Sequence, residues 1–85
     1  MPEISRFLGV IITMYWGDHA PPHFHASYGD YEITVNIHNG VVEGKFPKRA
    51  LRLVLEWYEL HQEELVVNWE NCRNKQPVIP IEPLE

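Results

Sequence analysis

The chain has a single cysteine, Cys72, among its 85 residues. One cysteine cannot form a disulfide within the chain, and this usage is typical of a protein in a reducing compartment. Long hydrophobic runs are also missing, because no segment approaches the roughly 20 apolar residues that a membrane-spanning helix needs. The N-terminus lacks the basic and apolar stretches of a secretory signal. We therefore expect a cytoplasmic protein without membrane contact.

Basic residues are scarce: 7 Lys and Arg stand against 12 Asp and Glu, so the formal net charge is −5. Proteins that coat nucleic acid normally carry a basic surface, so this balance disfavours a nucleic-acid partner, although a local basic patch would still allow one. A glycine-rich phosphate loop, a Cys-x-x-Cys pair and a His-Glu-x-x-His motif are all absent from the sequence. The common signatures of nucleotide-binding and zinc-protease families are therefore not present.

Hydrophobic residues, by contrast, make up 45% of the chain, and aromatic residues make up 12%. This content is sufficient for a packed core and argues against disorder. Domains usually contain about 100–200 residues, so this chain is too short for two independent cores. We expect residues 1–85 to form one domain.

The two halves of the chain differ in the spacing of their hydrophobic residues. In the first half, alternating and β-branched runs predict strands at residues 7–16, 23–28, 31–38 and 41–46, and Asn39-Gly40 is typical of a tight hairpin turn. From residue 47 the spacing is helical. One helix over residues 47–74 would be about 42 Å long, more than the roughly 30 Å diameter of so small a globule. We therefore predict a break near His61–Glu63.

The predicted fold is α+β. A small antiparallel sheet of three to four strands occupies residues 5–46, and two helices, at about residues 47–61 and 63–74, pack on one of its faces. Residues 75–85 contain three prolines. Because proline interrupts both helices and strand ladders, we expect an extended C-terminal tail there.

The segment from Asp18 to His25 contains three of the five histidines. On a strand, His23 and His25 point to the same face. Two imidazoles at this spacing can hold one metal ion, and His19 or Asp18 could reach back across the proline turn as a third ligand. The metal hypothesis takes His19, His23 and His25 as ligands of a divalent transition metal such as Zn²⁺.

Without a metal, the same segment suggests acid–base chemistry. His23 and His25 would act as the acid and the base, with Asp18 as the third catalytic residue, as in cleavage of a phosphodiester. The plainer alternative is that these histidines are polar residues on the solvated face of a strand. The sequence leaves all three interpretations open.

A second feature is the group of basic residues at the start of the first predicted helix, namely Lys48, Arg49 and Arg52. Cations at this end of a helix oppose its dipole. A sequence that carries them there suggests an anion- or phosphate-binding role, shared with the free N–H groups of the first turn. The alternative is a solvated basic turn that balances nearby glutamates.

Three stretches of the sequence resemble a known family: PEISRFLGVIITMYWGDHAPPHFHASYGDYE, FPKRALRLVLEWYELHQEELVVNWE and IEPL. They are similar to the bacterial domain-of-unknown-function 4160 family over essentially the whole chain. The characteristic segment of that family corresponds here to Asp18, His19, Pro21, Pro22, His23, His25, Tyr28 and Gly29. The family has no established chemistry, so the resemblance implies no catalytic role. It does imply a small protein partner of the domain-of-unknown-function 2442 type, encoded by a neighbouring gene, in an arrangement like that of toxin–antitoxin pairs.

Three functions remain open at this point. The first is a toxin-like component that acts on RNA or translation, in which His23 and His25 transfer protons and the basic helix start binds phosphate. This hypothesis expects both features to face one shared cleft. The second is a metal-binding module. The third is a non-catalytic interaction domain that pairs with a partner chain or with itself as a homo-oligomer.

Overall fold

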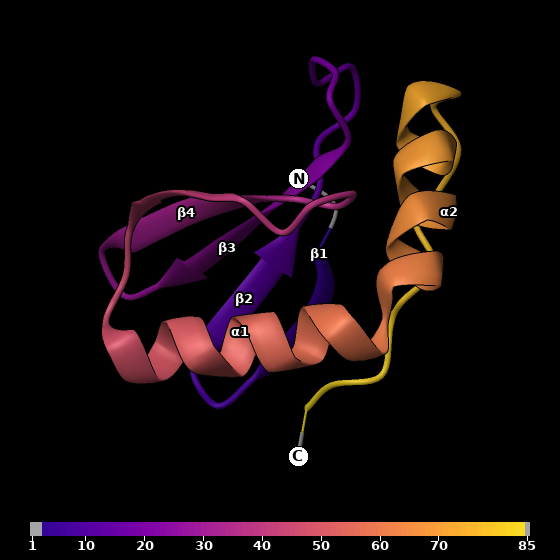
Figure 1. Ribbon diagram of the computed structural model, residues 1–85. Coiled ribbons are helices and arrows are strands. Elements are labelled where there is room, and N and C mark those ends of the chain that lie inside the picture. The colour runs from indigo at the N-terminus through magenta and orange to yellow at the C-terminus, as the bar shows by residue number, and fades with distance from the viewer. Residues whose placement is uncertain (1–2, 85) are drawn as a thin grey trace.

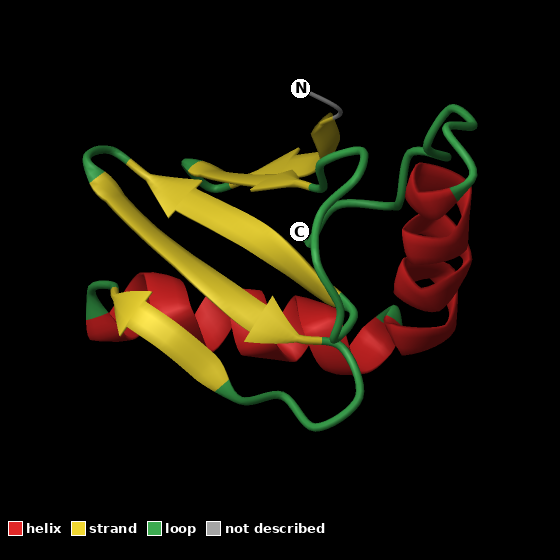
Figure 2. Cartoon of the chain, turned by 90° about the horizontal axis from the view of Figure 1, so that it is seen from above, coloured by secondary structure: helices red, strands yellow, loops and turns green. Residues whose placement is uncertain are grey.

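A computed structural model describes residues 3–84, which form a five-stranded antiparallel sheet followed by two helices (Figure 1, Figure 2). The strands lie side by side in chain order. The elements are β1 (Glu3–Phe7), β2 (Val10–Thr13), β3 (His23–Tyr28), β4 (Tyr31–Asn36), β5 (Val42–Lys45), α1 (Lys48–Leu60) and α2 (Gln62–Arg73). The predicted α+β fold, with the sheet before the helices, is confirmed. Within residues 3–84, neither helix has the length and apolar character needed to cross a lipid bilayer.

The sheet has five strands rather than three to four, because the segment predicted as one strand at residues 7–16 is divided by a hairpin turn. The chain reverses at Leu8 and Gly9, whose φ angles are +50° and +87°. Glycine adopts positive φ at little cost, so Gly9 is the position within this hydrophobic run where the strand breaks. Phe7 then pairs with Val10, which adds β1 at the edge of the sheet and makes β2 an interior strand.

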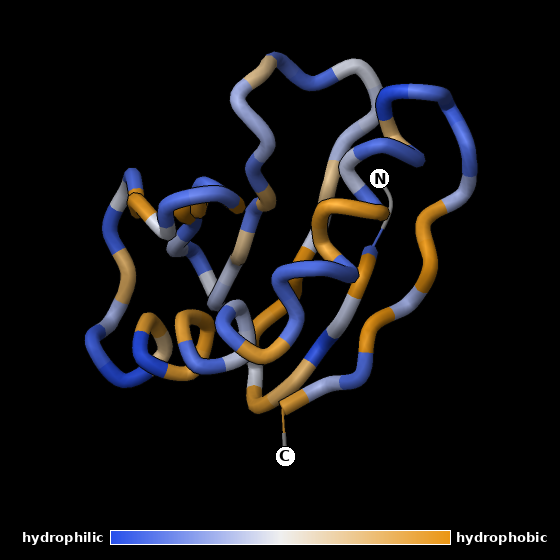
Figure 3. Tube along the Cα trace, turned by 45° about the vertical axis from the view of Figure 1, so that its right-hand side comes forward, coloured by the Kyte–Doolittle hydropathy of each residue, from blue (hydrophilic) through white to orange (hydrophobic). Residues whose placement is uncertain are grey.

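The hydrophobic core lies between α1 and one face of the sheet. Phe24 of β3 is fully buried on that face, and its ring centroid lies 5.7 Å from that of the fully buried Trp57 of α1. α1 runs along this face (Figure 1), and hydrophobic residues recur along its turns (Figure 3). Because successive side chains of a strand alternate between the faces, His23 and His25 point to the face opposite α1.

His61 separates the two helices, with a φ of −128° and a ψ of 26° that interrupt the helical backbone. The predicted break is therefore confirmed. Glu63 and Glu64 lie in the first turn of α2, where carboxylates complement the positive end of the helix dipole. α2 stands crosswise to α1 (Figure 1). Its buried Trp69 packs against His23, with 5.3 Å between the ring centroids, so α2 places an aromatic side chain beside the histidines.

The residues after α2 return along the molecule as an extended segment. The side chain of Asn68, which is 1% exposed, forms two hydrogen bonds with the backbone of Ile79. The N–H of Ile81 donates to the carbonyl of Ile4 at 3.0 Å, and the indole N–H of Trp57 donates to the carbonyl of Glu82 at 2.9 Å. The segment therefore covers the outer edge of β1, where strand N–H and C=O groups would otherwise lack partners.

Candidate functional site

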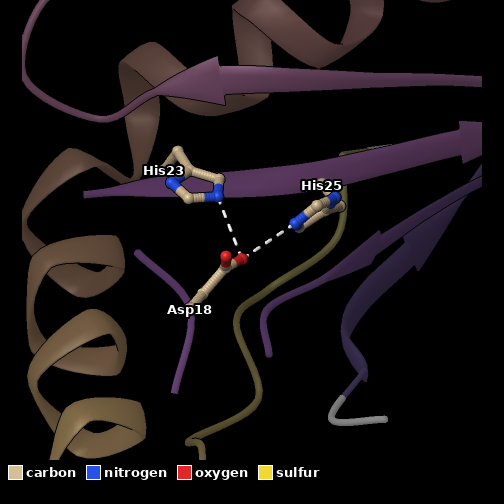
Figure 4. A group of neighbouring side chains, drawn as sticks. All are labelled: Asp18, His23 and His25. Atoms are coloured by element: carbon tan, nitrogen blue, oxygen red, sulfur yellow. Dashed lines mark hydrogen bonds and ion pairs between the residues drawn. The ribbon is translucent and has the colours of Figure 1, made fainter. Parts of the chain in front are cut away.

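Three polar side chains from two segments meet on the face of the sheet opposite α1 (Figure 4). His23 and His25 project from β3, and Asp18 comes from the loop between β2 and β3. That loop turns at Gly17, whose φ is +74°. The turn returns the chain toward β3 and places the Asp18 carboxylate between the two imidazoles (Figure 4).

A single oxygen of Asp18 contacts both histidines. The Oδ2 atom lies 2.9 Å from Nε2 of His23 and 3.1 Å from Nε2 of His25. The three atoms all lie within 4.8 Å of one another. These side chains are between 17% and 22% exposed, so the cluster is partly shielded from water.

The outer nitrogen of each imidazole is also engaged. Nδ1 of His23 lies 2.8 Å from the carbonyl oxygen of Pro21, and Nδ1 of His25 lies 3.1 Å from Oε2 of Glu32. A carbonyl or an ionised carboxylate can only accept a hydrogen bond, so a neutral imidazole donates either to this outer partner or to Asp18. When the proton is on Nδ1, Nε2 presents its lone pair to Asp18. An Nε2 lone pair and Oδ2 of Asp18 attract each other only through a positive group between them. That group is either a second proton on each imidazole or a cation bound to all three atoms.

Aromatic rings enclose the histidines. The ring of Tyr15 packs edge-on against His25 with 4.4 Å between centroids, and Trp69 contacts His23. Such contacts restrict the rotamers of the imidazoles and exclude water from their flanks. The donors are therefore held in position before any ligand arrives.

The pKa of Asp18 is shifted below its ordinary value. Partial burial acts in the opposite direction, but the hydrogen bond with His25, the backbone N–H of His19 and the charges of His23 and His25 together outweigh it. Asp18 is therefore a carboxylate at neutral pH.

Burial raises the pKa of the Cys72 thiol on α2, and the negative charge of Asp18 raises it further. Cys72 is thus a neutral, buried thiol.

His19, which the sequence suggested as a metal ligand, does not belong to this cluster. Its side chain is exposed, and its backbone N–H donates to Oδ1 of Asp18 at 3.0 Å. The set of His19, His23 and His25 is therefore not brought together, and Asp18 occupies the place of the third ligand. Asp18, His23 and His25, the residues of the acid–base hypothesis, do meet.

The basic residues Lys48, Arg49 and Arg52 are exposed at the start of α1. The expectation that they share a cleft with the histidines is wrong. α1 packs on the face of the sheet that carries Phe24, whereas His23 and His25 point to the other face. Arg49 lines a hollow with Leu8 and other residues near Pro47, and within residues 3–84 no histidine takes part in that hollow.

Glu32 is a site residue that the sequence analysis missed. It follows the short turn between β3 and β4, in which Tyr28 pairs with Tyr31. This register places Thr34 opposite His25, so Glu32 is the diagonal neighbour of His25 on the same face. The Gly29-Asp30 turn already fixes this register, so the signal was present in the sequence.

No curated protein and no solved structure matches the chain. Residues 9–70, which cover most of the chain and include the whole Asp18, His23 and His25 cluster, match a family described as a domain of unknown function, DUF4160. The chain belongs to this family.

Proposed function

We propose that Asp18, His23 and His25 bind a divalent transition metal ion, and that the protein is a metal-binding module. The observation that carries this proposal is the convergence of three donor atoms, one carboxylate oxygen and two imidazole Nε2 atoms, whose nearest separations are 2.9 and 3.1 Å. Two imidazoles and one carboxylate are a common ligand set for zinc and for non-haem iron.

The separations fit a shared ion. Ligand atoms about 2.1 Å from a metal lie roughly 3.0 Å apart at octahedral angles and roughly 3.4 Å apart at tetrahedral angles. The contacts between Asp18 and the two histidines, at 2.9 and 3.1 Å, lie at the lower end of this range.

The outer hydrogen bonds support the same assignment. Metal-binding histidines generally donate their other N–H to a carbonyl or carboxylate, which fixes the tautomer and increases the basicity of the ligating nitrogen. Pro21 supplies such a carbonyl to His23, and Glu32 supplies a carboxylate to His25. Three protein ligands leave at least one coordination position open, as metal-assisted hydrolysis or oxygen chemistry requires.

Titration calorimetry with Zn²⁺ and absorption spectroscopy with Co²⁺ test the proposal. We expect one ion per chain and a Co²⁺ spectrum of low-symmetry nitrogen and oxygen coordination. Loss of an outer hydrogen-bond partner of a ligand typically costs about 10–100-fold in metal affinity, so loss of a ligand itself, in His23→Ala or His25→Ala, should cost about 100-fold or more. His19→Ala is the matched control, because it removes an exposed imidazole beside the site, and it should bind like the parent protein. Unchanged binding by His23→Ala, or loss of binding by His19→Ala, would contradict the proposal.

A second candidate is the metal-free alternative, in which the chain is a toxin-like cytoplasmic component acting on RNA or translation together with a small protein partner. The observation that favours it is the carboxylate shared by two imidazoles, since such a group can hold one histidine protonated beside a second that acts as base. Induced expression, alone and with the neighbouring gene, tests it through growth arrest and RNA integrity. Full toxicity of His23→Ala, or absence of toxicity in the parent protein, would exclude this function.

A further inference from the structure

A cavity of about 340 Å³ opens beside the proposed metal ligands on the same face of the sheet. Asp18 and His23 line one end of it, and Thr34, Asn36 and Glu43 belong to the part formed by β4 and β5. Its volume lies at the lower end of the range for small-molecule pockets. An open coordination position of the metal would therefore adjoin a space large enough for a small organic ligand.

The charges around this cavity limit what it can hold. Among residues 3–84, no lysine or arginine lines it, whereas Asp18 and Glu43 contribute carboxylates. His19 also lines the cavity, but a nucleotide or another phosphate-rich ligand would find no lysine or arginine there to pair with its phosphates. Once the metal neutralises Asp18, the inner end of the cavity is positive and the end near Glu43 is negative.

The sheet register places residues of the two ends on one row. His25 is paired with Thr34, and Thr34 is paired with Glu43, so the three residues form one row across β3, β4 and β5. Two strand spacings, about 9.6 Å, separate the backbone of His25 from that of Glu43. Glu43 therefore lies across the sheet from the proposed metal ligands, on the same face.

Two side chains of the cavity have unused hydrogen-bonding capacity within the described part of the chain. Oδ1 of Asn36 accepts from the N–H groups of His38 and Asn39, but the side-chain NH₂ of Asn36 donates to no described residue. Glu43 forms none of the salt bridges among residues 3–84. The cavity thus offers an amide donor and a carboxylate acceptor.

We propose that this cavity binds a short amino carboxylate, with the ligand carboxylate on the metal and the ligand ammonium on Glu43. This inference rests on the proposed metal-binding function. The carboxylate completes the coordination of the ion and can accept from the NH₂ of Asn36, while the ammonium neutralises Glu43. β-Alanine, in which two methylene groups separate the carboxylate from the ammonium, is the probe for this class of ligand.

The experiment titrates β-alanine, propionate and propylamine into protein loaded with substoichiometric Co²⁺, and follows the Co²⁺ absorption spectrum and the heat of binding. Propionate lacks the ammonium and propylamine lacks the carboxylate. Since a charge-assisted hydrogen bond is worth about tenfold or more in affinity, we expect β-alanine to bind more tightly than either by that factor.

Glu43→Gln should abolish the preference for β-alanine over propionate and leave the Co²⁺ affinity unchanged. Glu56→Gln, an exposed carboxylate on α1, is the matched control and should keep the preference.

The outcomes separate this inference from the proposed function. If Co²⁺ binds but β-alanine binds no better than propionate, or if Glu43→Gln keeps the preference, the inference is wrong and the metal site stands. If Co²⁺ does not bind, both are wrong.

Discussion

Asp18 connects the β2–β3 loop to the sheet through its contacts with His23 and His25, and these contacts are stronger when its carboxyl group is ionised. One of its oxygens lies near both histidines, and its pKa is held below the ordinary value despite partial burial. A lowered pKa in the folded state means that the carboxylate stabilises the fold at pH values above its unfolded pKa of about 3.9. This contribution is lost as the pH falls through the lower, folded pKa.

Asp18→Asn should therefore destabilise the protein in a pH-dependent way. Without metal, and with a chelator present, we expect the free energy of unfolding to fall by about 1–2 kcal/mol near pH 6. The difference should shrink as the pH falls through the folded pKa of Asp18 and vanish below it, because the carboxyl of the parent protein is then protonated. Urea unfolding across this range measures the difference. A difference that stays constant with pH would show that the charge of Asp18 is not what stabilises the loop.

Asn68 contributes to the stability of the fold rather than to the candidate site. Its buried amide forms both a donor and an acceptor contact with Ile79, at 2.9 and 2.7 Å. Asn68→Ala would leave two backbone groups of Ile79 without these partners, so we expect a loss of about 2–3 kcal/mol in urea unfolding. Asn71→Ala, on the same helix, removes a side chain with no hydrogen bond among the described residues and should cost much less. Equal losses would contradict the assigned role of Asn68.

At the level of elements, the features that could be predicted are those fixed by local sequence. The hairpin after Tyr28 depends on nearby residues and is present; the helix break at His61, also present, followed instead from the size of the globule. The β1–β2 hairpin was missed because a continuous hydrophobic run has the same composition whether or not it reverses at Gly9. Strand alternation correctly placed His23 and His25 on one face.

The remaining errors at the site have physical reasons. Loop residues have no periodicity, so nothing in the sequence could choose between Asp18 and His19 as the third ligand. The shared cleft was an avoidable error. Phe24 lies between the two histidines, and its apolar side chain already indicated that the core and α1 lie on the opposite face.

The β1–β2 hairpin gives a prediction at this scale. A Cβ atom added at Gly9 would lie 2.9 Å from Cε1 of Tyr28, and its φ of +87° is unfavourable for other residues. Gly9→Ala should cost about 1–3 kcal/mol through strain and displacement of the Tyr28 ring. Gly29→Ala is the matched control, because Gly29 also has positive φ but has nothing within 4 Å of the added atom. Thermal unfolding should show a larger loss for Gly9→Ala, and the reverse order would contradict the close approach of Tyr28 to Gly9.

For the molecule as a whole, the aromatic packing of α1 and the candidate chemistry lie on opposite faces of the sheet. Phe24 and Trp57 bury their surfaces on one face, while Asp18, His23 and Glu43 line the cavity on the other. Residues on the cavity face can therefore change without opening the core. The proposed metal would nevertheless affect global stability, since its ligands come from a loop and a strand that meet only when the chain is folded.

The last prediction follows from this coupling. A ligand that binds only the folded state, present at about 100 times its Kd, adds about 2.7 kcal/mol of stability. For a domain of this size, that corresponds to a rise in Tm of roughly 10–20 °C. We expect Zn²⁺ or Ni²⁺ to raise the Tm in this way near pH 7.5. Imidazole must be unprotonated to bind a metal, so the rise should diminish with acidification and be lost below about pH 6.

The acid dependence distinguishes the proposed site from a site made of surface carboxylates alone. Carboxylates remain ionised near pH 5.5, so metal bound only by them would still raise the Tm there. His23→Ala and His25→Ala should lose most of the rise near pH 7.5, whereas His19→Ala should behave like the parent protein. A rise in Tm that persists near pH 5.5, or that survives in His23→Ala, would mean that the metal binds elsewhere. Asp18 would then hold the two histidines together through their protons alone.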